Sequence, residues 1–174
     1  MTIGLNKTFN WIDQNGTGKV ISFHIPGNRE CATCHKSNDA LIPIGAKINN
    51  LNIEVVRNSA TANQLTYFQS IGILNPVNPS SFSQFPNSHN TSLPTSERAR
   101  AYLDINCATC HSQNGIASGT DLYFDYELPL GETNITHNKN QIKNMMSTGV
   151  MPRLGTTVID EESLALVTTY INSL

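Results

Sequence analysis

All four cysteines of the chain lie in two copies of one pentapeptide, Cys31–His35 and Cys107–His111, each of which reads Cys-Ala-Thr-Cys-His. Side chains three and four residues apart lie on the same face of a helical turn. Both sulfurs of a copy therefore reach one edge of a flat macrocycle, and the histidine reaches its centre. Haem c is attached through this spacing, by two thioethers and an iron-ligating imidazole.

The sequence accordingly predicts two covalently bound haem c groups, each with one iron. The attachment and ligating residues that it predicts are Cys31, Cys34, His35, Cys107, Cys110 and His111.

Three other uses of paired cysteines fit this pattern less well. A redox dithiol does not need the histidine after each pair, and the chain shows no thioredoxin-like strand–helix–strand pattern. Zinc ribbons separate their pairs by roughly 15–20 residues, whereas 72 residues, 35–106, intervene here. Structural disulfides leave both histidines unexplained. Covalent haem accounts for every cysteine.

Length and charge narrow the class of protein. A chain of 174 residues makes one ordinary domain or two very small ones. Its 11 Lys and Arg against 13 Asp and Glu leave a net charge of −2, which predicts neither a nucleic-acid surface nor an acidic tail. No apolar run approaches the roughly 18 residues of a membrane span, and the first residues lack the order of a signal peptide.

A weaker internal repeat accompanies the pentapeptides, which lie 76 residues apart. A second similarity has an offset of 77 residues: Asn63–Leu65, followed by Gly72, aligns with Asn140–Ile142, followed by Gly149. Since the two offsets differ by one residue, a single loop insertion reconciles them. The stretch between the copies is rich in Pro, Ser and Asn, as linkers are. The repeat therefore predicts two modules of similar plan.

The second half has the clearer pattern of elements. Ala99 and Leu103 predict the apolar stripe of a helix that starts at an N-cap of Thr95 or Ser96 and runs into Cys107.

A middle helix is expected over about 138–148, and Gly149 should end it. Met151-Pro152 follows, and a last helix is expected near 160–172. This order resembles a class I cytochrome c. By that resemblance Met151 is the distal iron ligand, and a thioether is a soft ligand that raises the haem potential. Met145 and Met146 are interpreted as core residues.

The expected fold is mostly α, with two small cytochrome c-like haem modules in tandem at 1–80 and 95–174. A linker at 81–94 joins them. One short β-hairpin is expected near the N-terminus, because residues 20–25 alternate in polarity after an Asn15-Gly16 turn.

The first module has no counterpart of Met151. The repeat offset leads from Met151 back to Leu74, and Met1, the only methionine of that half, is a chain end. The sixth ligand of the first iron is therefore a different residue, or it is absent.

His24 is the first candidate for that metal ligand, because it lies in the expected strand shortly before Cys31. His89, in the linker, and an open iron are the alternatives. Candidates for the haem propionates are Arg29, Arg57, Arg98, Arg100 and Arg153.

Across most of its length the chain resembles dihaem c-type cytochrome domains of a poorly characterised bacterial family. The resemblance rests on Glu30–His35, Asn63–Leu65, Arg98–Leu103 and Asn106–His111. It implies a periplasmic or otherwise extracytoplasmic location, and a larger parent chain whose other domains are potential partners.

The expected function is electron relay between redox partners, a donor and an acceptor, through two haems of unequal potential. The alternatives are a small dihaem peroxidase-like enzyme and a gas-binding haem protein, both of which use an open first iron. No catalytic residue is predicted, since Glu54, Glu127 and Gln141 occupy ordinary positions. An electron-transfer protein is therefore favoured over an enzyme.

Overall fold

A computed structural model describes residues 3–13, 15–37, 40–41, 43–152 and 158–174. Contacts between residues divide the chain into two units. The first consists of Met1–Ile44 together with Ser88–Leu174, and the second of Gly45–Asn87. Each unit is described by itself below.

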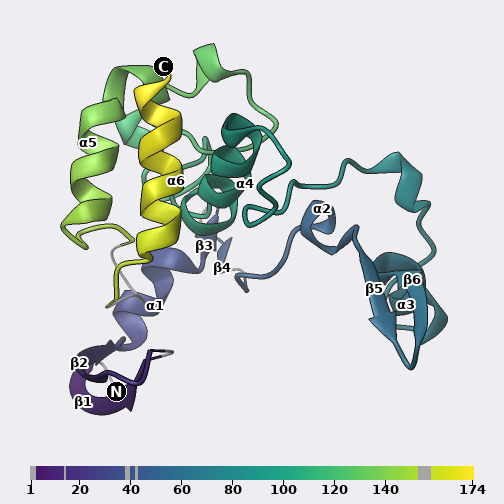
Figure 1. Ribbon diagram of the computed structural model, residues 1–174, viewed down its shortest axis with the longest axis horizontal. Helices are drawn as coiled ribbons and strands as arrows, with labels where there is room; N and C mark the ends of the chain where they lie inside the picture. Colours follow the sequence, from purple (N-terminus) through teal and green to yellow (C-terminus); the bar gives the residue numbers. More distant parts are fainter. Residues whose placement is uncertain (1–2, 14, 38–39, 42, 153–157) are drawn as a thin grey trace. The chain divides into compact units, whose positions relative to one another are not determined.

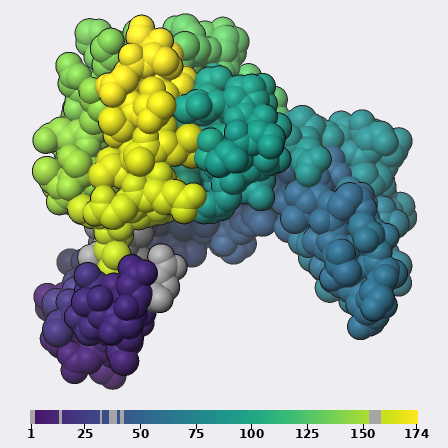
Figure 2. Space-filling model, viewed as in Figure 1, coloured from purple at the N-terminus to yellow at the C-terminus, as the bar shows by residue number. Residues whose placement is uncertain are grey.

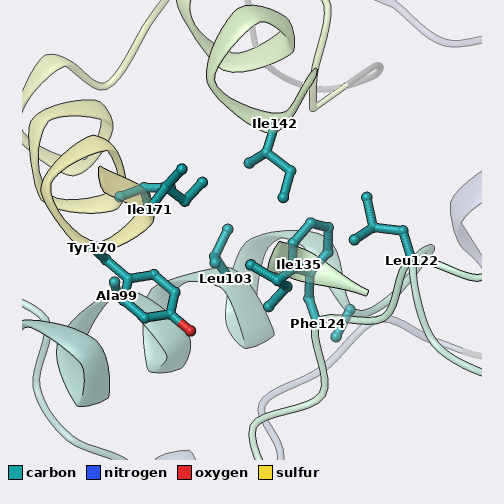
Figure 3. Close-up of a cluster of buried hydrophobic side chains, with 10 residues drawn as sticks. Ala99, Leu103, Leu122, Phe124, Ile135, Ile142, Tyr170 and Ile171 are labelled. Atoms are coloured by element: carbon teal, nitrogen blue, oxygen red, sulfur yellow. The ribbon is translucent and has the colours of Figure 1, made fainter. Parts of the chain in front are cut away.

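Three helices form the framework of the first unit: α4 (Thr95–Cys107), α5 (Ile135–Ser147) and α6 (Glu161–Asn172). Helix α6 packs against both α4 and α5 (Figure 1). In Figure 2, α6 (yellow) and α4 (teal) adjoin on the surface. Their apolar faces meet in one buried cluster (Figure 3), whose members are Ala99, Leu103, Ala108, Leu122, Phe124, Ile135, Ile142, Val167, Tyr170 and Ile171.

The three helices match the elements expected from the pattern of the second half, with local differences at their ends. Helix α4 begins at Thr95 after the N-cap Pro94, so the expected N-cap of Thr95 or Ser96 is wrong. Helix α6 has the side chain of Asp160 as its N-cap, accepting from the Ser163 N–H. Gly149 follows α5 with a φ of +68°, the left-handed conformation that ends helices.

The segment between α4 and α5 has short 3-10 turns, η2 (Ser118–Thr120) and η3 (Leu130–Glu132), in place of longer elements. Arg100 on α4 holds it, because its Nη2 donates to the carbonyls of Asp125, Tyr126 and Leu128 at 2.7–3.1 Å. This segment is therefore fixed to the helices by hydrogen bonds as well as by burial.

The N-terminal part of the first unit contains the expected hairpin. Strands β1 (Leu5–Ile12) and β2 (Gly18–Ile25) pair antiparallel, and Gly16 in the turn has a φ of +76°. Helix α1 (Asn28–Cys34) follows, and strands β3 (Lys36–Ser37) and β4 (Ala40–Leu41) pair after it.

The second unit is built on another hairpin, β5 (Glu54–Arg57) and β6 (Ala60–Asn63). Its turn residues Asn58 and Ser59 both have positive φ, of 50° and 66°, as a type I′ hairpin turn requires. Helices α2 (Ile48–Leu51) and α3 (Gln64–Ser70) and the turn η1 (Pro79–Ser81) complete the unit.

Side chains far apart in the sequence close this second unit. Leu65 and Phe85 are buried in it. Asn52 donates to the carbonyls of Pro79 and Phe82 and accepts from Asn63. A small apolar core and a buried amide network therefore hold the unit together.

The expectation of a mostly α fold is wrong. The described residues form three two-stranded antiparallel sheets in addition to the helices, so the fold is mixed α and β. The reason lies in the first half, where β-branched residues flank turns such as Asn58-Ser59 and favour strands. Tandem cytochrome c-like modules do not describe this architecture.

The bounds of the two units also differ from the division expected at 1–80, 81–94 and 95–174. The expected linker contributes Phe85 to the buried residues of the 45–87 unit, where its N–H donates to the Asn49 carbonyl. Among the described residues, every helix is too short or too polar to cross a bilayer.

Candidate functional site

The second pentapeptide forms the tight turn in which α4 ends. The N–H groups of Cys110 and His111 donate to the carbonyl of Cys107, the last residue of the helix, at 3.1 and 2.9 Å. Gly115 packs so closely on this turn that a Cβ there would overlap the Cys110 carbonyl oxygen. Both cysteines and the histidine are thus placed by one rigid segment.

The imidazole of His111 is oriented by its surroundings. Its Nδ1 lies 3.3 Å from the carbonyl oxygen of Leu122, and the ring of Phe124 meets it edge-on at 5.4 Å. Burial lowers the pKa of His111, which favours the neutral ring. A neutral imidazole that donates through Nδ1 keeps the lone pair of Nε2 for a metal, and such a carbonyl partner is usual for metal-ligating histidines.

An apolar cavity of about 610 Å³ lies beside this turn. Its size is within the range of cofactor sites, roughly 300–1,000 Å³. The cysteines Cys107 and Cys110, the ligand candidate His111 and the distal candidate Met151 all line it. One cavity therefore holds both expected attachment residues and both expected axial ligands of the second haem.

Met151 lies at the exposed edge of this cavity, with 36% of its surface accessible. Its N–H donates to the Met145 carbonyl at 3.1 Å, which ties it to the end of α5. Met145 and Met146 also line the cavity, and Met146 packs against the apolar cluster as well. Their interpretation as core residues therefore describes only part of their surroundings.

The thiols of the second pentapeptide are poor nucleophiles in this environment. Burial raises the pKa of Cys107 to about 12 and that of Cys110 to about 11. Redox dithiols work through a lowered thiol pKa, so this environment disfavours that alternative. Among the described residues, no three His, Cys, Asp or Glu side chains converge as in a zinc site.

The first pentapeptide also ends a helix. Cys34 is the last residue of α1 and His35 is its C-cap, while Cys31 is exposed. Thr33 and Cys34 line the cavity described above, as Cys110 does. The structure therefore brings the two pentapeptides together at one cavity.

His24 lies on β2, and both of its ring nitrogens have partners. Nδ1 is 2.7 Å from Asn6 Oδ1 and Nε2 is 2.9 Å from Glu30 Oε1. Iron ligation by His24 would require one of these partners to leave. The alternative, His89, lies 3.1 Å from a carboxylate oxygen of Glu162 and is largely exposed.

Two arginines expected near the propionates have structural partners instead: Arg98 donates to the Ser88 carbonyl, and Arg100 to the three carbonyls named above. Arg57 stacks on Tyr67 in the 45–87 unit, at 4.2 Å from the ring centroid. Arg153 lies outside the described residues.

Sequence reasoning missed the uncharged polar side chains of the cavity wall. Asn138 and Gln141 on α5 line the cavity together with Thr109 and Thr120. The sequence did contain a signal for the two amides. Asn138 and Gln141 are three residues apart, as residues on one face of a helix are, and Gln141 directly precedes the buried Ile142. These amides can donate hydrogen bonds to a ligand without adding charge.

No protein-family model, curated protein or solved structure matches the chain.

Proposed function

We propose that the chain is a dihaem c-type cytochrome, similar to the bacterial domains that its motifs resemble, which relays electrons between two redox partners. The observation that carries the proposal is that Cys107, Cys110, His111 and Met151 line one apolar cavity. Two thiols at the attachment spacing, a neutral imidazole and a thioether form the donor set of a His/Met haem c.

When bound, each haem supplies one-electron chemistry at its iron. The chain's own residues set the conditions for it. Cys107 and Cys110 hold the macrocycle edge, and the Leu122 carbonyl orients His111. The sulfur of Met151 favours the reduced iron and raises the potential of this site.

The first site is served by Cys31, Cys34 and His35, and the sequence has Leu74 at the position that the repeat aligns with Met151. His24 is the candidate for its second axial ligand. A site without a thioether ligand has the lower potential, since methionine ligation raises it. Unequal ligands thus give the electron a preferred direction, from the first site to the second.

Attachment of haem c takes place outside the cytoplasm in the cytochromes that the motifs resemble, so we place the mature protein in the periplasm or an equivalent compartment. Its partners are a reduced donor and an oxidised acceptor protein. The net charge of −2 gives no strong electrostatic steering, which leaves docking to short-range contacts.

A redox titration of the purified protein, produced in a periplasm with the cytochrome c maturation machinery, tests the function. We expect two one-electron steps of separate potential, with both irons low-spin and reducible by small donors. Reduction in one step contradicts two sites of unequal potential. A ferrous form that binds carbon monoxide at the first iron contradicts a simple relay and favours the gas-binding or peroxidase-like alternative.

A further inference from the structure

One side of the β1–β2 hairpin is apolar. Residues two apart on a strand, and residues paired across two strands, point to the same side of a sheet. The register pairs Leu5 with Ile25 and Phe9 with Ile21. The side that these pairs share carries six apolar side chains, called the hairpin face below: Leu5, Phe9, Trp11, Ile21, Phe23 and Ile25.

The opposite side of the hairpin is mostly polar, and it is the side that contacts α1. Asn6 and His24 lie on it, 2.7 Å apart, and Nε2 of His24 is 2.9 Å from Oε1 of Glu30 on α1. Gly4 packs so closely here that a Cβ on it would overlap both His24 and Glu30. The hairpin face is therefore turned away from α1.

The hairpin face is open to solvent. Phe9 and Trp11 each expose 42% of their surface, and Leu5 and Ile25 expose 36% and 38%. Among the described elements, β1 and β2 have extensive contacts only with each other. An isolated two-stranded hairpin is at best marginally stable in water unless something packs on its apolar side. The hairpin face therefore needs a partner surface.

Two lysines are the charged residues that β1 and β2 place on this side. Lys7 lies over the Phe9 ring, 5.3 Å from its centroid, and Lys19 lies 3.8 Å from Asp13, the residue after β1. Lysine is depleted in protein–protein interfaces, where arginine is the favoured cation. Lysines beside tryptophan, phenylalanine and leucine are typical of segments that lie in a bilayer surface, where the ammonium reaches the headgroups.

The exposed area is small for an interface between two copies of the chain. At about 200 Å² for a large aromatic side chain, the hairpin face exposes on the order of 400 Å². Two copies packed face to face would bury roughly 800 Å² in total, which is below the range of stable interfaces. The packing would also bring Lys7 and Lys19 of both copies into one interface. Binding to a bilayer scales with apolar area and with attraction to anionic lipids, and it has no such threshold.

We propose that the hairpin face binds the surface of an anionic lipid bilayer. Its aromatic and aliphatic side chains enter the boundary between headgroups and acyl chains, and Lys7 and Lys19 contact lipid phosphates. The His24–Glu30 contact then holds α1, with the first pentapeptide, to the bound hairpin. The proposal does not depend on the proposed function.

Co-sedimentation of the purified 174-residue chain with large vesicles tests the proposal. We expect binding to vesicles of equal parts phosphatidylcholine and phosphatidylglycerol, and weaker binding to phosphatidylcholine alone. Added salt should weaken the first. Trp11 is the only tryptophan of the chain, so its emission should shift to the blue as the hairpin face enters the lipid. Absence of binding to the anionic vesicles overturns the proposal.

Phe9→Ser with Phe23→Ser removes two aromatic groups from the hairpin face and leaves Trp11 as the reporter. We expect the affinity for the anionic vesicles to fall at least about tenfold, since full burial of one such side chain is worth that much. The matched control, Ile12→Ser with Val20→Ser, removes two exposed apolar side chains from the opposite side of the same strands. The control should bind like the wild type, and an equal loss in both variants overturns the assignment to this face.

Lys7→Glu tests the charge while every apolar side chain of the hairpin face stays in place. Each lysine near an anionic surface is worth several-fold in affinity, so we expect this charge reversal to lower the affinity for the anionic vesicles by about tenfold. Binding to phosphatidylcholine alone should not change. An unchanged affinity for the anionic vesicles overturns the proposal.

Sedimentation equilibrium without lipid distinguishes a second copy of the chain from a bilayer. We expect the wild type to be a monomer at the concentrations of the vesicle assay. A dimer that Phe9→Ser with Phe23→Ser dissociates would assign the hairpin face to a second copy and overturn the proposal. A chain that binds the anionic vesicles but carries no haem overturns the proposed function and leaves this proposal standing.

Discussion

His111 and Met151 line one cavity from two distant parts of the sequence, and hydrogen bonds to backbone carbonyls help to hold each of them. The Leu122 carbonyl accepts from the imidazole, and the Met145 carbonyl accepts from the Met151 N–H. If they ligate iron as proposed, residues fixed in this way need little rearrangement when the iron changes its charge. The roles of these two residues are therefore testable by single substitutions.

Met151→Ala should remove the sulfur ligand that we propose for the second iron. We expect its potential to fall by on the order of 0.1 V, a fraction of the roughly 0.8 V over which axial ligands tune haem. A redox titration measures the shift. Met145→Ala, at the same cavity wall, is the matched control and should leave the potential nearly unchanged. The reverse result would assign the ligand to Met145.

His24→Ala should alter the low-potential step and the low-temperature EPR spectrum of the first iron, because the substitution removes the candidate ligand. His89→Ala is the control, since that side chain pairs with Glu162. If the spectrum of the first haem is unchanged in His24→Ala, His24 does not ligate that iron and only forms its hydrogen bonds with Asn6 and Glu30.

Helix α6 holds the cavity-forming elements together, since it packs on both α4 and α5. Ile171→Ala removes a fully buried side chain from this packing. We expect unfolding free energy to fall by about 2–5 kcal/mol. Urea unfolding measures the change. The control, Thr169→Ala on the exposed face of α6, should have a free energy of unfolding within about 0.5 kcal/mol of the wild type. An equal loss in both variants would contradict the claim that Ile171 stabilises the fold by its buried packing.

The N-cap of α6 predicts a pH dependence. Burial acts to raise the pKa of Asp160, but hydrogen bonds from Ser163 and Tyr102 outweigh it and leave the pKa below its ordinary 3.8. The ionised carboxylate therefore stabilises the folded state above this value, and the contribution is lost as the pH falls through the folded-state pKa.

Asp160→Ala should accordingly cost about 1 kcal/mol at neutral pH, and the difference from wild type should shrink below pH 3.8. Urea unfolding across this range measures it. Asp160→Asn keeps an oxygen that accepts the Ser163 N–H, so it should lose less. A difference that stays constant into strong acid would rule out the carboxylate as the cause.

At the scale of elements, the sequence predicted the second half better than the first. The stripe of Ala99 and Leu103 depends on local periodicity and the stop at Gly149 on a glycine, and a sequence displays both directly. The hairpin with the turn Asn58-Ser59 also has a local signal in the sequence. The internal repeat nevertheless led to the prediction that the first half, like the second, is a helical module. Gly72 and Gly149, which the repeat aligns, both have a positive φ after a helix. The structural similarity of the two halves is therefore limited to helix ends.

At the scale of the whole molecule, the sequence indicated which residues carry the chemistry but not their spatial relation. Spacing alone predicts that Cys107, Cys110 and His111 act together, because they share one turn. Cys34 and Cys110 are equivalent positions of the repeat, 76 residues apart, but the repeat does not predict that both line one cavity. That depends on how the N-terminal segment packs against the C-terminal helices.

The central claim is that both pentapeptides carry haem. Intact mass spectrometry of the chain, matured in a periplasm with the cytochrome c attachment machinery, tests it most directly. We predict a mass increase of two haems for the wild type, and of one for each variant in which one pentapeptide has both cysteines replaced by serine. A wild-type chain with the unmodified polypeptide mass would contradict the account.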